Sequence, residues 1–177
     1  MRVVAGTAGG RRLQAPAGRD TRPTSDRVRE ATFNALHSLG AVEGASVVDL
    51  FAGSGAMGVE ALSRGADRVT FVDHDPRAIA TIRLNLDRTG LAATTTATVV
   101  RAEASDYLAG APRFDLAILD PPYAMTDEEW AALLSKLDAD VAVLESDRPI
   151  DPGPRWRITR EGRYGDTVVT FTRHPAP

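Results

Sequence analysis

The chain has 177 residues, of which 43% are hydrophobic and 25% are charged, and it contains no cysteine. A chain of this size and composition fits one globular domain, and the lack of cysteine excludes disulfides and thiolate metal sites. No apolar run approaches the roughly 18 residues that indicate a transmembrane helix, and no basic-then-apolar signal pattern opens the sequence, so we expect a cytoplasmic location.

The net charge of −3 is unevenly distributed along the chain. Residues 1–30 hold seven arginines against three acidic residues, whereas the remainder holds fourteen basic against twenty-one acidic residues. A second arginine cluster lies within residues 155–173. Arginine that is concentrated on an otherwise acidic chain favours a local polyanion-binding face over a merely solvated surface.

The first 40 residues are expected to form an N-terminal extension made of a hairpin and a helix. A β-hairpin is predicted where Val3-Val4-Ala5 and Arg12-Leu13-Gln14 flank the glycine-rich segment 6–10. Pro23, followed by the hydroxyl residues Thr24 and Ser25, predicts the start of a helix, and apolar residues then recur at helical spacing until Gly40.

From residue 46 the pattern alternates between short apolar runs and amphipathic stretches. It predicts strands at 46–51, 68–73, 96–101, 114–119 and 141–145, and helices near 56–64, 76–89, 104–109 and 126–137. Regular alternation implies an α/β fold with a mostly parallel sheet and helices on both faces. Two further strands, at 155–159 and 167–172, break the alternation and predict a closing antiparallel hairpin. We expect one domain, with the extension at 1–40 and the core at 41–177.

A glycine loop follows the first of these strands. Residues 53–58 match G-x-G-x-x-G, and Asp73 lies 20 residues beyond Gly53, which taken alone is the fingerprint of a dinucleotide-binding loop. Asp49, however, lies inside the preceding strand, where its carboxylate would face a pyrophosphate. S-adenosylmethionine carries a sulfonium and an ammonium but no phosphate, so this carboxylate favours it as the ligand.

The predicted donor-binding residues lie at the carboxyl ends of three strands. The glycines permit close backbone approach to the ligand, and Asp73 is placed to accept hydrogen bonds from two ribose hydroxyls. Glu103 follows the third strand and could accept from the adenine amino group, although a solvated loop glutamate is nearly as good an interpretation. The full set is Asp49, Phe51, Ala52, Gly53, Ser54, Gly55, Asp73, Glu103 and Ala104.

An acceptor site is predicted at Asp120-Pro121-Pro122-Tyr123, directly after the apolar strand 114–119. An exocyclic amine is a poor nucleophile because its lone pair is delocalised into the ring. The carboxylate of Asp120 and the carbonyl of Pro121 can accept from its two N–H groups, and the prolines preorganise these acceptors. Tyr123 offers a face on which the base can stack. These four residues are therefore the predicted catalytic set.

The chain resembles the RsmD family, bacterial methyltransferases of the guanine N2 amine in small-subunit ribosomal RNA. The resemblance runs nearly end to end. Its motifs are Arg2-Val3-Val4-Ala5-Gly6, Gly10-Arg11-Arg12-Leu13, Thr21-Arg22-Pro23-Thr24-Ser25-Asp26-Arg27-Val28-Arg29-Glu30, Asp49-Leu50-Phe51-Ala52-Gly53-Ser54-Gly55, Glu60-Ala61-Leu62-Ser63-Arg64-Gly65, Asp120-Pro121-Pro122-Tyr123 and Tyr164-Gly165-Asp166-Thr167.

This resemblance implies a seven-stranded, Rossmann-like class I methyltransferase fold that uses S-adenosylmethionine and releases S-adenosylhomocysteine. It implies that the substrate is 16S rRNA, within a small ribosomal subunit or its assembly intermediate, with no obligate protein partner. The N-terminal extension becomes an RNA-contacting element, for which the predicted residues are Arg2, Arg11, Arg12, Arg22, Arg27 and Arg29. Glu103 departs from the family, whose members often have Asn or Asp there.

Other functions remain possible from the residues. A DNA adenine-N6 methyltransferase usually carries a target-recognition domain, and a protein glutamine methyltransferase usually has Asn in place of Asp120. A non-catalytic RNA-binding module would need neither Asp49 nor Asp120. A nicotinamide dehydrogenase would need a second domain for its substrate. The three histidines show no metal-ligand spacing, so no metal is expected.

Overall fold

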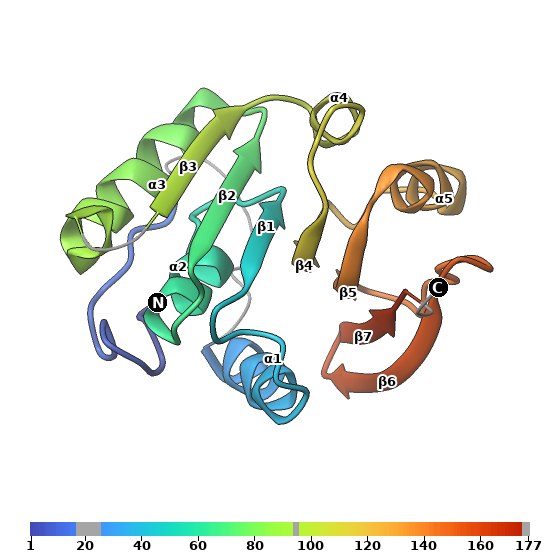
Figure 1. The fold of residues 1–177 in the computed structure, drawn as a ribbon, viewed down its shortest axis with the longest axis horizontal. Coiled ribbons are helices and arrows are strands. Elements are labelled where there is room, and N and C mark those ends of the chain that lie inside the picture. Colours follow the sequence, from blue (N-terminus) through green and yellow to red (C-terminus); the bar gives the residue numbers. More distant parts are fainter. Residues whose placement is uncertain (17–25, 94–95, 175–177) are drawn as a thin grey trace.

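The computed structural model describes residues 1–16, 26–93 and 96–174. Its centre is a seven-stranded sheet in the order β3-β2-β1-β4-β5-β7-β6 (Figure 1). The first five strands in sequence pair in parallel, and the last two add antiparallel at one side. The strands are β1 (Ser46–Leu50), β2 (Arg68–Asp73), β3 (Thr96–Arg101), β4 (Phe114–Leu119), β5 (Ala139–Ser146), β6 (Arg157–Tyr164) and β7 (Thr167–Arg173).

Helices cover both faces of the sheet, and each face has its own apolar core. The helices are α1 (Asp26–Ser38), α2 (Ala56–Ser63), α3 (Pro76–Thr89), α4 (Ala104–Leu108) and α5 (Asp127–Lys136), with a short 3-10 turn at Leu91–Ala93. Apolar residues of α1, α2, α3 and the N-terminal segment form one core with the sheet, and those of α4 and α5 form the other. None of the helices in the described part is long and apolar enough to cross a membrane.

The alternating pattern of the sequence predicts most elements closely. The strands at 68–73, 96–101 and 114–119 and the helix at 76–89 are confirmed residue for residue. The predicted strand at 155–159 instead spans Arg157–Tyr164, because pairing with β7 extends it through Glu161 and Gly162, which have low strand propensity. Trp130 and Trp156 are both buried in the core.

The N-terminal β-hairpin is only partly present. A single antiparallel bridge joins Arg2 to Arg12, and the two segments do not form a longer ladder of paired residues. Across this bridge the Val3 and Leu13 N–H groups donate to the carbonyls of Arg11 and Met1, at 2.9 and 3.1 Å. The Ala5 N–H, the next one that could extend the ladder, donates instead to the Glu60 carboxylate on α2 at 3.1 Å, and the outward Val4 N–H donates to the same carboxylate at 2.7 Å. The helix start predicted at Pro23–Ser25 lies outside the described residues, and Asp26 is the first described residue of α1.

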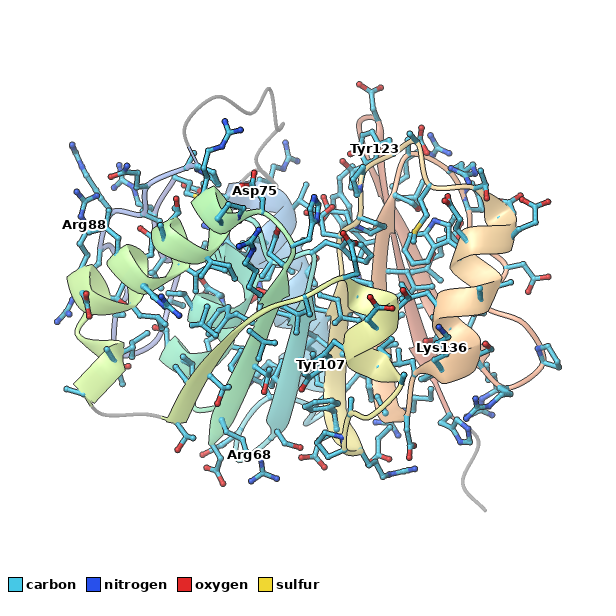
Figure 2. All side chains as sticks on the ribbon, turned by 90° about the horizontal axis from the view of Figure 1, so that it is seen from above. Arg68, Asp75, Arg88, Tyr107, Tyr123 and Lys136 are labelled. Atoms are coloured by element: carbon cyan, nitrogen blue, oxygen red, sulfur yellow. The ribbon has the colours of Figure 1, made fainter. Side chains whose placement is uncertain are left out.

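The topology brings the ends of three central strands together. Leu50 on β1 pairs with Val72 on β2 and with Leu119 on β4. The chain therefore leaves these strands side by side, and the residues that follow them lie at one edge of the sheet. Figure 2 shows Asp75 and Tyr123 at this edge and Arg68 at the opposite one. Ligands of open α/β sheets bind at the carboxyl edge.

Candidate active site

Asp49 is a buried carboxylate at the base of the site. It lies on β1, is only 2% exposed, and its Oδ2 accepts a hydrogen bond from the Gly58 N–H at 2.8 Å. Burial raises the pKa of Asp49 well above its ordinary value, the Gly58 N–H opposes this, and the negative charges of Asp120 and Asp73 raise it further. Three carboxylates thus act on one another at the edge of the sheet, which favours a positively charged ligand.

The glycine loop between β1 and α2 has an unusual backbone. Phe51 has a φ of 60°, in the left-handed region that non-glycine residues rarely adopt, and Gly53 and Gly55 have φ values of 56° and 76°. A Cβ built on Gly53 would meet nothing nearer than 3.8 Å, so the backbone there is open to a ligand. Such local strain occurs at functional sites that the surrounding fold holds in place.

The later glycines of the loop have a packing role. A Cβ on Gly58 would lie 2.2 Å from Cε1 of Phe71 on β2, and one on Gly55 would lie 3.1 Å from Cγ1 of Ile82 on α3. The loop and the first turn of α2 can therefore lie this close to β2 and α3 only because Gly55 and Gly58 carry no side chain. Close approach to the ligand, which the sequence suggests for all the glycines, is available at Gly53, whereas Gly55 and Gly58 serve helix–sheet packing.

Asp73 braces the loop while facing the same edge. Its Oδ2 accepts from the Gly53 N–H and its Oδ1 from the Asp75 N–H, both at 2.8 Å. Each carboxylate oxygen can accept more than one hydrogen bond, so this bracing leaves capacity for a ligand. Asp75 in turn caps α3, because its side chain accepts from the Arg77 N–H at 2.8 Å.

Glu103 and Ala104 lie where β3 leads into α4. The Ala102 N–H donates to the Asp73 carbonyl at 3.2 Å, which holds this turn beside the end of β2. Glu103 is the N-cap residue of α4, yet its side chain makes no capping hydrogen bond and is exposed. Ala104 is buried. The turn thus presents Glu103 to solvent at the carboxyl edge of the sheet.

The Asp120–Tyr123 motif forms the outer side of the site. Asp120 is half-buried, Pro121 is buried, and Pro122 and Tyr123 are exposed. The Pro122 carbonyl accepts from the Met125 N–H at 3.0 Å, which closes the turn. The Tyr123 hydroxyl lies 3.3 Å from Oγ1 of Thr167 at the start of β7, while 37% of the residue is exposed. The motif is thus a firmly held turn that offers an aromatic ring to solvent.

Two buried polar residues connect the N-terminal segment to this site, and sequence reasoning does not identify either. The Asn85 side chain on α3 accepts from the Gln14 N–H and donates to the carbonyls of Gln14 and Ser54, all within 2.9 Å. Glu60 is fully buried and holds the N-terminal backbone as described above. The sequence signal that could have identified Glu60 and Asn85 is that each is a polar residue at a position where the helix otherwise has apolar, core-facing residues.

The predicted RNA-contacting arginines differ in their surroundings. Arg2, Arg12 and Arg27 are exposed. Arg11 donates from Nη1 to the Thr89 carbonyl at the end of α3. Arg22 lies outside the described residues.

The prediction for Arg29 is wrong, because this residue is fully buried and cannot reach a phosphate. Its guanidinium donates to the Arg2 carbonyl and to Asp26, and its Nε lies 3.5 Å from Oε2 of Glu60. Arg29 therefore joins α1 and the N-terminal segment to α2. A buried arginine is commonly paired in this way.

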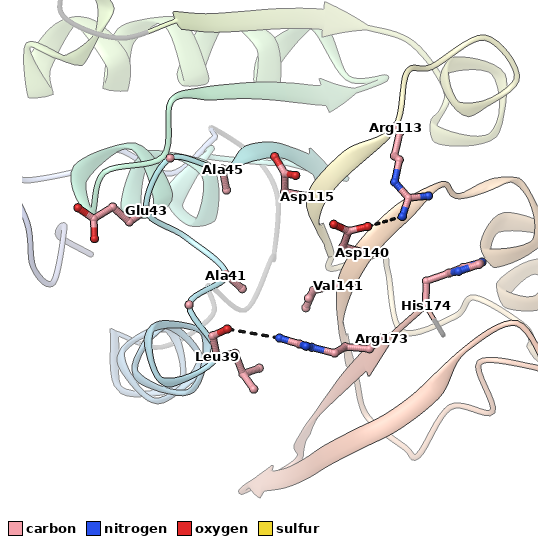
Figure 3. Close-up of a pocket in the computed structure, with 12 residues that line it drawn as sticks. Leu39, Ala41, Glu43, Ala45, Arg113, Asp115, Asp140, Val141, Arg173 and His174 are labelled. Carbon is pink, nitrogen blue, oxygen red and sulfur yellow. Dashed lines mark hydrogen bonds and ion pairs between the residues drawn. The ribbon is translucent and has the colours of Figure 1, made fainter. Parts of the chain in front are cut away.

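A separate cavity of about 510 Å³ lies at the opposite edge of the sheet (Figure 3). Its arginines are already engaged: Arg113 pairs with Asp140, and Arg173 donates to the Leu39 carbonyl at 3.3 Å. The size of this cavity does not make it the active site, because Asp49, Asp120 and Tyr123 lie at the other edge of the sheet. Among the described residues, no group of three or more acidic, histidine or cysteine side chains is arranged to hold a metal ion.

The chain matches known proteins over nearly its whole length. The family model described as Conserved hypothetical protein 95 matches residues 1–173. The Ribosomal RNA small subunit methyltransferase D of Escherichia coli (strain K12) is 38% identical over 188 residues, which cover 99% of this chain and 91% of that protein. The protein of the same name from Haemophilus influenzae is 34% identical over 181 residues, which cover 97% of this chain and 91% of that protein.

Solved structures agree with the sequence matches. The structure of yhhF from Escherichia coli has a TM-score of 0.83 and 31% identity to this chain, and the match covers 100% of this chain and 99% of that one. The seven-stranded mixed sheet with helices on both faces is the class I methyltransferase fold. The extent of the family match and the identity to these relatives show that the chain belongs to the RsmD family of ribosomal RNA methyltransferases.

Proposed function

We propose that this protein transfers a methyl group from S-adenosylmethionine to the exocyclic N2 amine of a guanine in small-subunit 16S rRNA. The observation that carries the proposal is the meeting of Asp49, Asp73 and Asp120 at one sheet edge, beside an exposed tyrosine. The carboxylates fit a cationic donor, and the tyrosine fits a planar base. Relatives named as ribosomal RNA small subunit methyltransferases support RNA as the substrate.

On the donor side, the residues of the glycine loop would hold the ligand against the sheet. Asp49 would offset the positive charge of the donor, Asp73 would accept from its ribose hydroxyls, and Glu103 with Ala104 would border its adenine. Phe51, Ala52, Gly53, Ser54 and Gly55 would supply the backbone that surrounds it. The open approach at Gly53 and the negative charge near Asp49 support this assignment.

On the acceptor side, Asp120 and the Pro121 carbonyl would accept from the two N–H groups of the guanine amine. These bonds direct the nitrogen lone pair toward the methyl carbon, so that the N–C bond forms as the S–C bond breaks and S-adenosylhomocysteine is released. The proton lost from nitrogen passes to Asp120 or to water. Tyr123 would stack on the base, for which its exposed ring and its hydroxyl contact with Thr167 are suited.

The exposed residues Arg2, Arg12 and Arg27 remain proposed contacts for RNA phosphates. Arg11 also remains a proposed contact, although its Nη1 already donates to the Thr89 carbonyl and only the rest of its guanidinium is available to RNA. An rRNA substrate, alone or within a small subunit or its assembly intermediate, also implies a cytoplasmic location. Glu103, which stands where family members often have Asn or Asp, would lie in the donor pocket, so this difference does not affect the proposal that guanine is the methyl acceptor.

The deciding experiment is nucleoside mass spectrometry of 16S rRNA from a strain that lacks this protein. We expect one N2-methylguanosine to disappear and to return when purified protein and S-adenosylmethionine are added to the RNA or to small subunits from that strain. Unchanged rRNA, together with methylation of DNA adenine or of a protein glutamine, would replace this proposal with one of those activities.

A further inference from the structure

The last strand of the sheet, β6, carries the second arginine cluster. It is the final strand in the sheet order and pairs with β7 alone. Nearly all of its residues are exposed or partly exposed, unlike those of β7, which are buried except at the end. Arg157 and Arg160 are exposed, and neither forms an ion pair with the described residues.

A β-bulge places these arginines on one face with an aromatic residue. Arg157, Arg160 and Tyr164 pair with alternate residues of β7 within the range 167–173, and side chains at alternate positions share a face. The register shift between Ile158 and Arg160 makes this possible, since without the extra residue Arg157 and Arg160 would point to opposite faces. We call Arg157, Arg160 and Tyr164 the β6 strip.

The chemistry of the β6 strip suits a nucleic-acid strand. The Arg160 guanidinium lies 5.9 Å from the centre of the Phe171 ring, which holds it at the surface. The Tyr164 ring lies over Gly162, where a Cβ would come within 3.0 Å of it, and the residue packs partly against the core, so that only part of it faces solvent. The strip carries no acidic residue, whereas on the other face Glu161 lies two residues from Arg163. Arginine forks and aromatic rings are the usual contacts for the phosphates and bases of a single strand.

The position of the strip relates it to the acceptor motif. Tyr164 pairs with Thr167, and Oγ1 of Thr167 lies 3.3 Å from the Tyr123 hydroxyl. The strip thus begins beside the acceptor turn and runs along β6 toward the other edge of the sheet, over roughly 20 Å at the usual rise per residue. The glycine-rich turn of the N-terminal segment lies elsewhere, because Thr7 and Ala8 bond to Ser63 at the far end of α2.

We propose that the β6 strip is an RNA-binding surface that holds the ribosomal RNA strand on one side of the target base. This inference rests on the RNA substrate proposed above and adds a contact region to it. Charge complementarity carries it: two arginines without ion pairs among the described residues lie on one face of a strand in an acidic chain, and the Tyr164 end of that strand lies beside the residue that would stack on the base. The other use of a charged edge strand is to prevent pairing with a second chain, and that role requires no RNA contact.

The test compares two double variants that lose the same charge. In R157Q/R160Q the strip loses both arginines, and in the control R88Q/R163Q two exposed arginines are lost from α3 and from the opposite face of β6. The probe is 16S rRNA, free and in small subunits, from a strain that lacks the protein. We expect R157Q/R160Q to raise the RNA KM about tenfold or more with kcat nearly unchanged, and to reduce the slope of log affinity against log salt by about 2.

Donor affinity and thermal unfolding of both variants show whether the fold is intact, and R157K/R160K should recover most of the affinity because it restores the charge. If R157Q/R160Q behaves like the control while wild type methylates the RNA, the strip is not an RNA surface and the proposed function stands. If wild type methylates neither form of the rRNA, the proposed function fails and this inference fails with it.

Discussion

The proposed donor and acceptor halves of the candidate site are built in opposite ways. The donor half lies around the buried Asp49, and its loop is held by the hydrogen bond from Gly58 and by direct contact of that glycine with Phe71. The acceptor half lies on an exposed turn, with a tyrosine that is 37% exposed. A small donor can be enclosed by a packed loop, whereas a target base that belongs to a large RNA must be met at the surface. Substitutions should therefore reduce stability in the donor half and reaction rate in the acceptor half.

The largest effect is expected for Asp120→Ala. Removing one preorganised electrostatic partner of the reacting group commonly costs on the order of 10²–10³ in rate, which here would appear in kcat. Because Asp120 is only half-buried on a turn, unfolding should change little. Single-turnover methylation of rRNA measures the rate, and Asp87→Ala on the exposed face of α3 is the control. A rate close to that of wild type would show that Asp120 does not activate the amine.

A smaller effect, on stability, is expected for Gly58→Ala. The added Cβ would lie 2.2 Å from the Phe71 ring, and overpacking of this kind costs about 1–3 kcal/mol. Gly110→Ala is the matched control, because a Cβ there meets nothing within 4 Å. Chemical denaturation should separate the two variants clearly. Equal stability would mean that the loop can move away from β2 at little cost, so that the donor half is not rigid.

The smallest effect concerns the pH dependence of donor binding. Since burial and the neighbouring charges of Asp120 and Asp73 raise the pKa of Asp49, its neutral form persists to higher pH than that of an exposed carboxyl. A cationic ligand favours the ionised form, so binding should release protons, and affinity should rise with pH up to the pKa of the free protein. Asp49→Asn should lower affinity about tenfold, equal to about 1.4 kcal/mol, and lose most of this dependence.

Calorimetry of S-adenosylmethionine binding in buffers of different ionisation enthalpy measures the proton release directly. The Asn variant, titrated in the same buffers, accounts for protons that come from the ligand itself. If wild type and variant released equal numbers of protons, Asp49 would keep one protonation state on donor binding, and the expected coupling between its raised pKa and the cationic ligand would be wrong.

The sheet and its motifs can be predicted from the sequence because their signals are local. Apolar runs and helical spacing predict β2, β3, β4 and α3, and the alternation predicts a mostly parallel sheet with helices on both faces. The burial of Arg29 cannot be predicted in this way, since its partner Glu60 lies 31 positions further along the chain. The contact between Tyr123 and Thr167 spans 44 positions, and the clash that requires glycine at 58 depends on a ring from another element. These features arise from tertiary packing, which no short window of sequence contains.

The hydrogen bonds of the N-terminal segment also bear on the order in which the chain folds during synthesis. Val4 is bound by a carboxylate 56 positions later, and Gln14 by an amide 71 positions later. The N-terminal segment can therefore form its local bonds, such as that from Val3 to Arg11, early in synthesis, but its bonds to Glu60 and Asn85 must wait until α2 and then α3 have been made. Until that moment the Ser54 carbonyl also lacks the Asn85 amide, so the donor loop acquires its final set of hydrogen bonds only after about half of the chain exists.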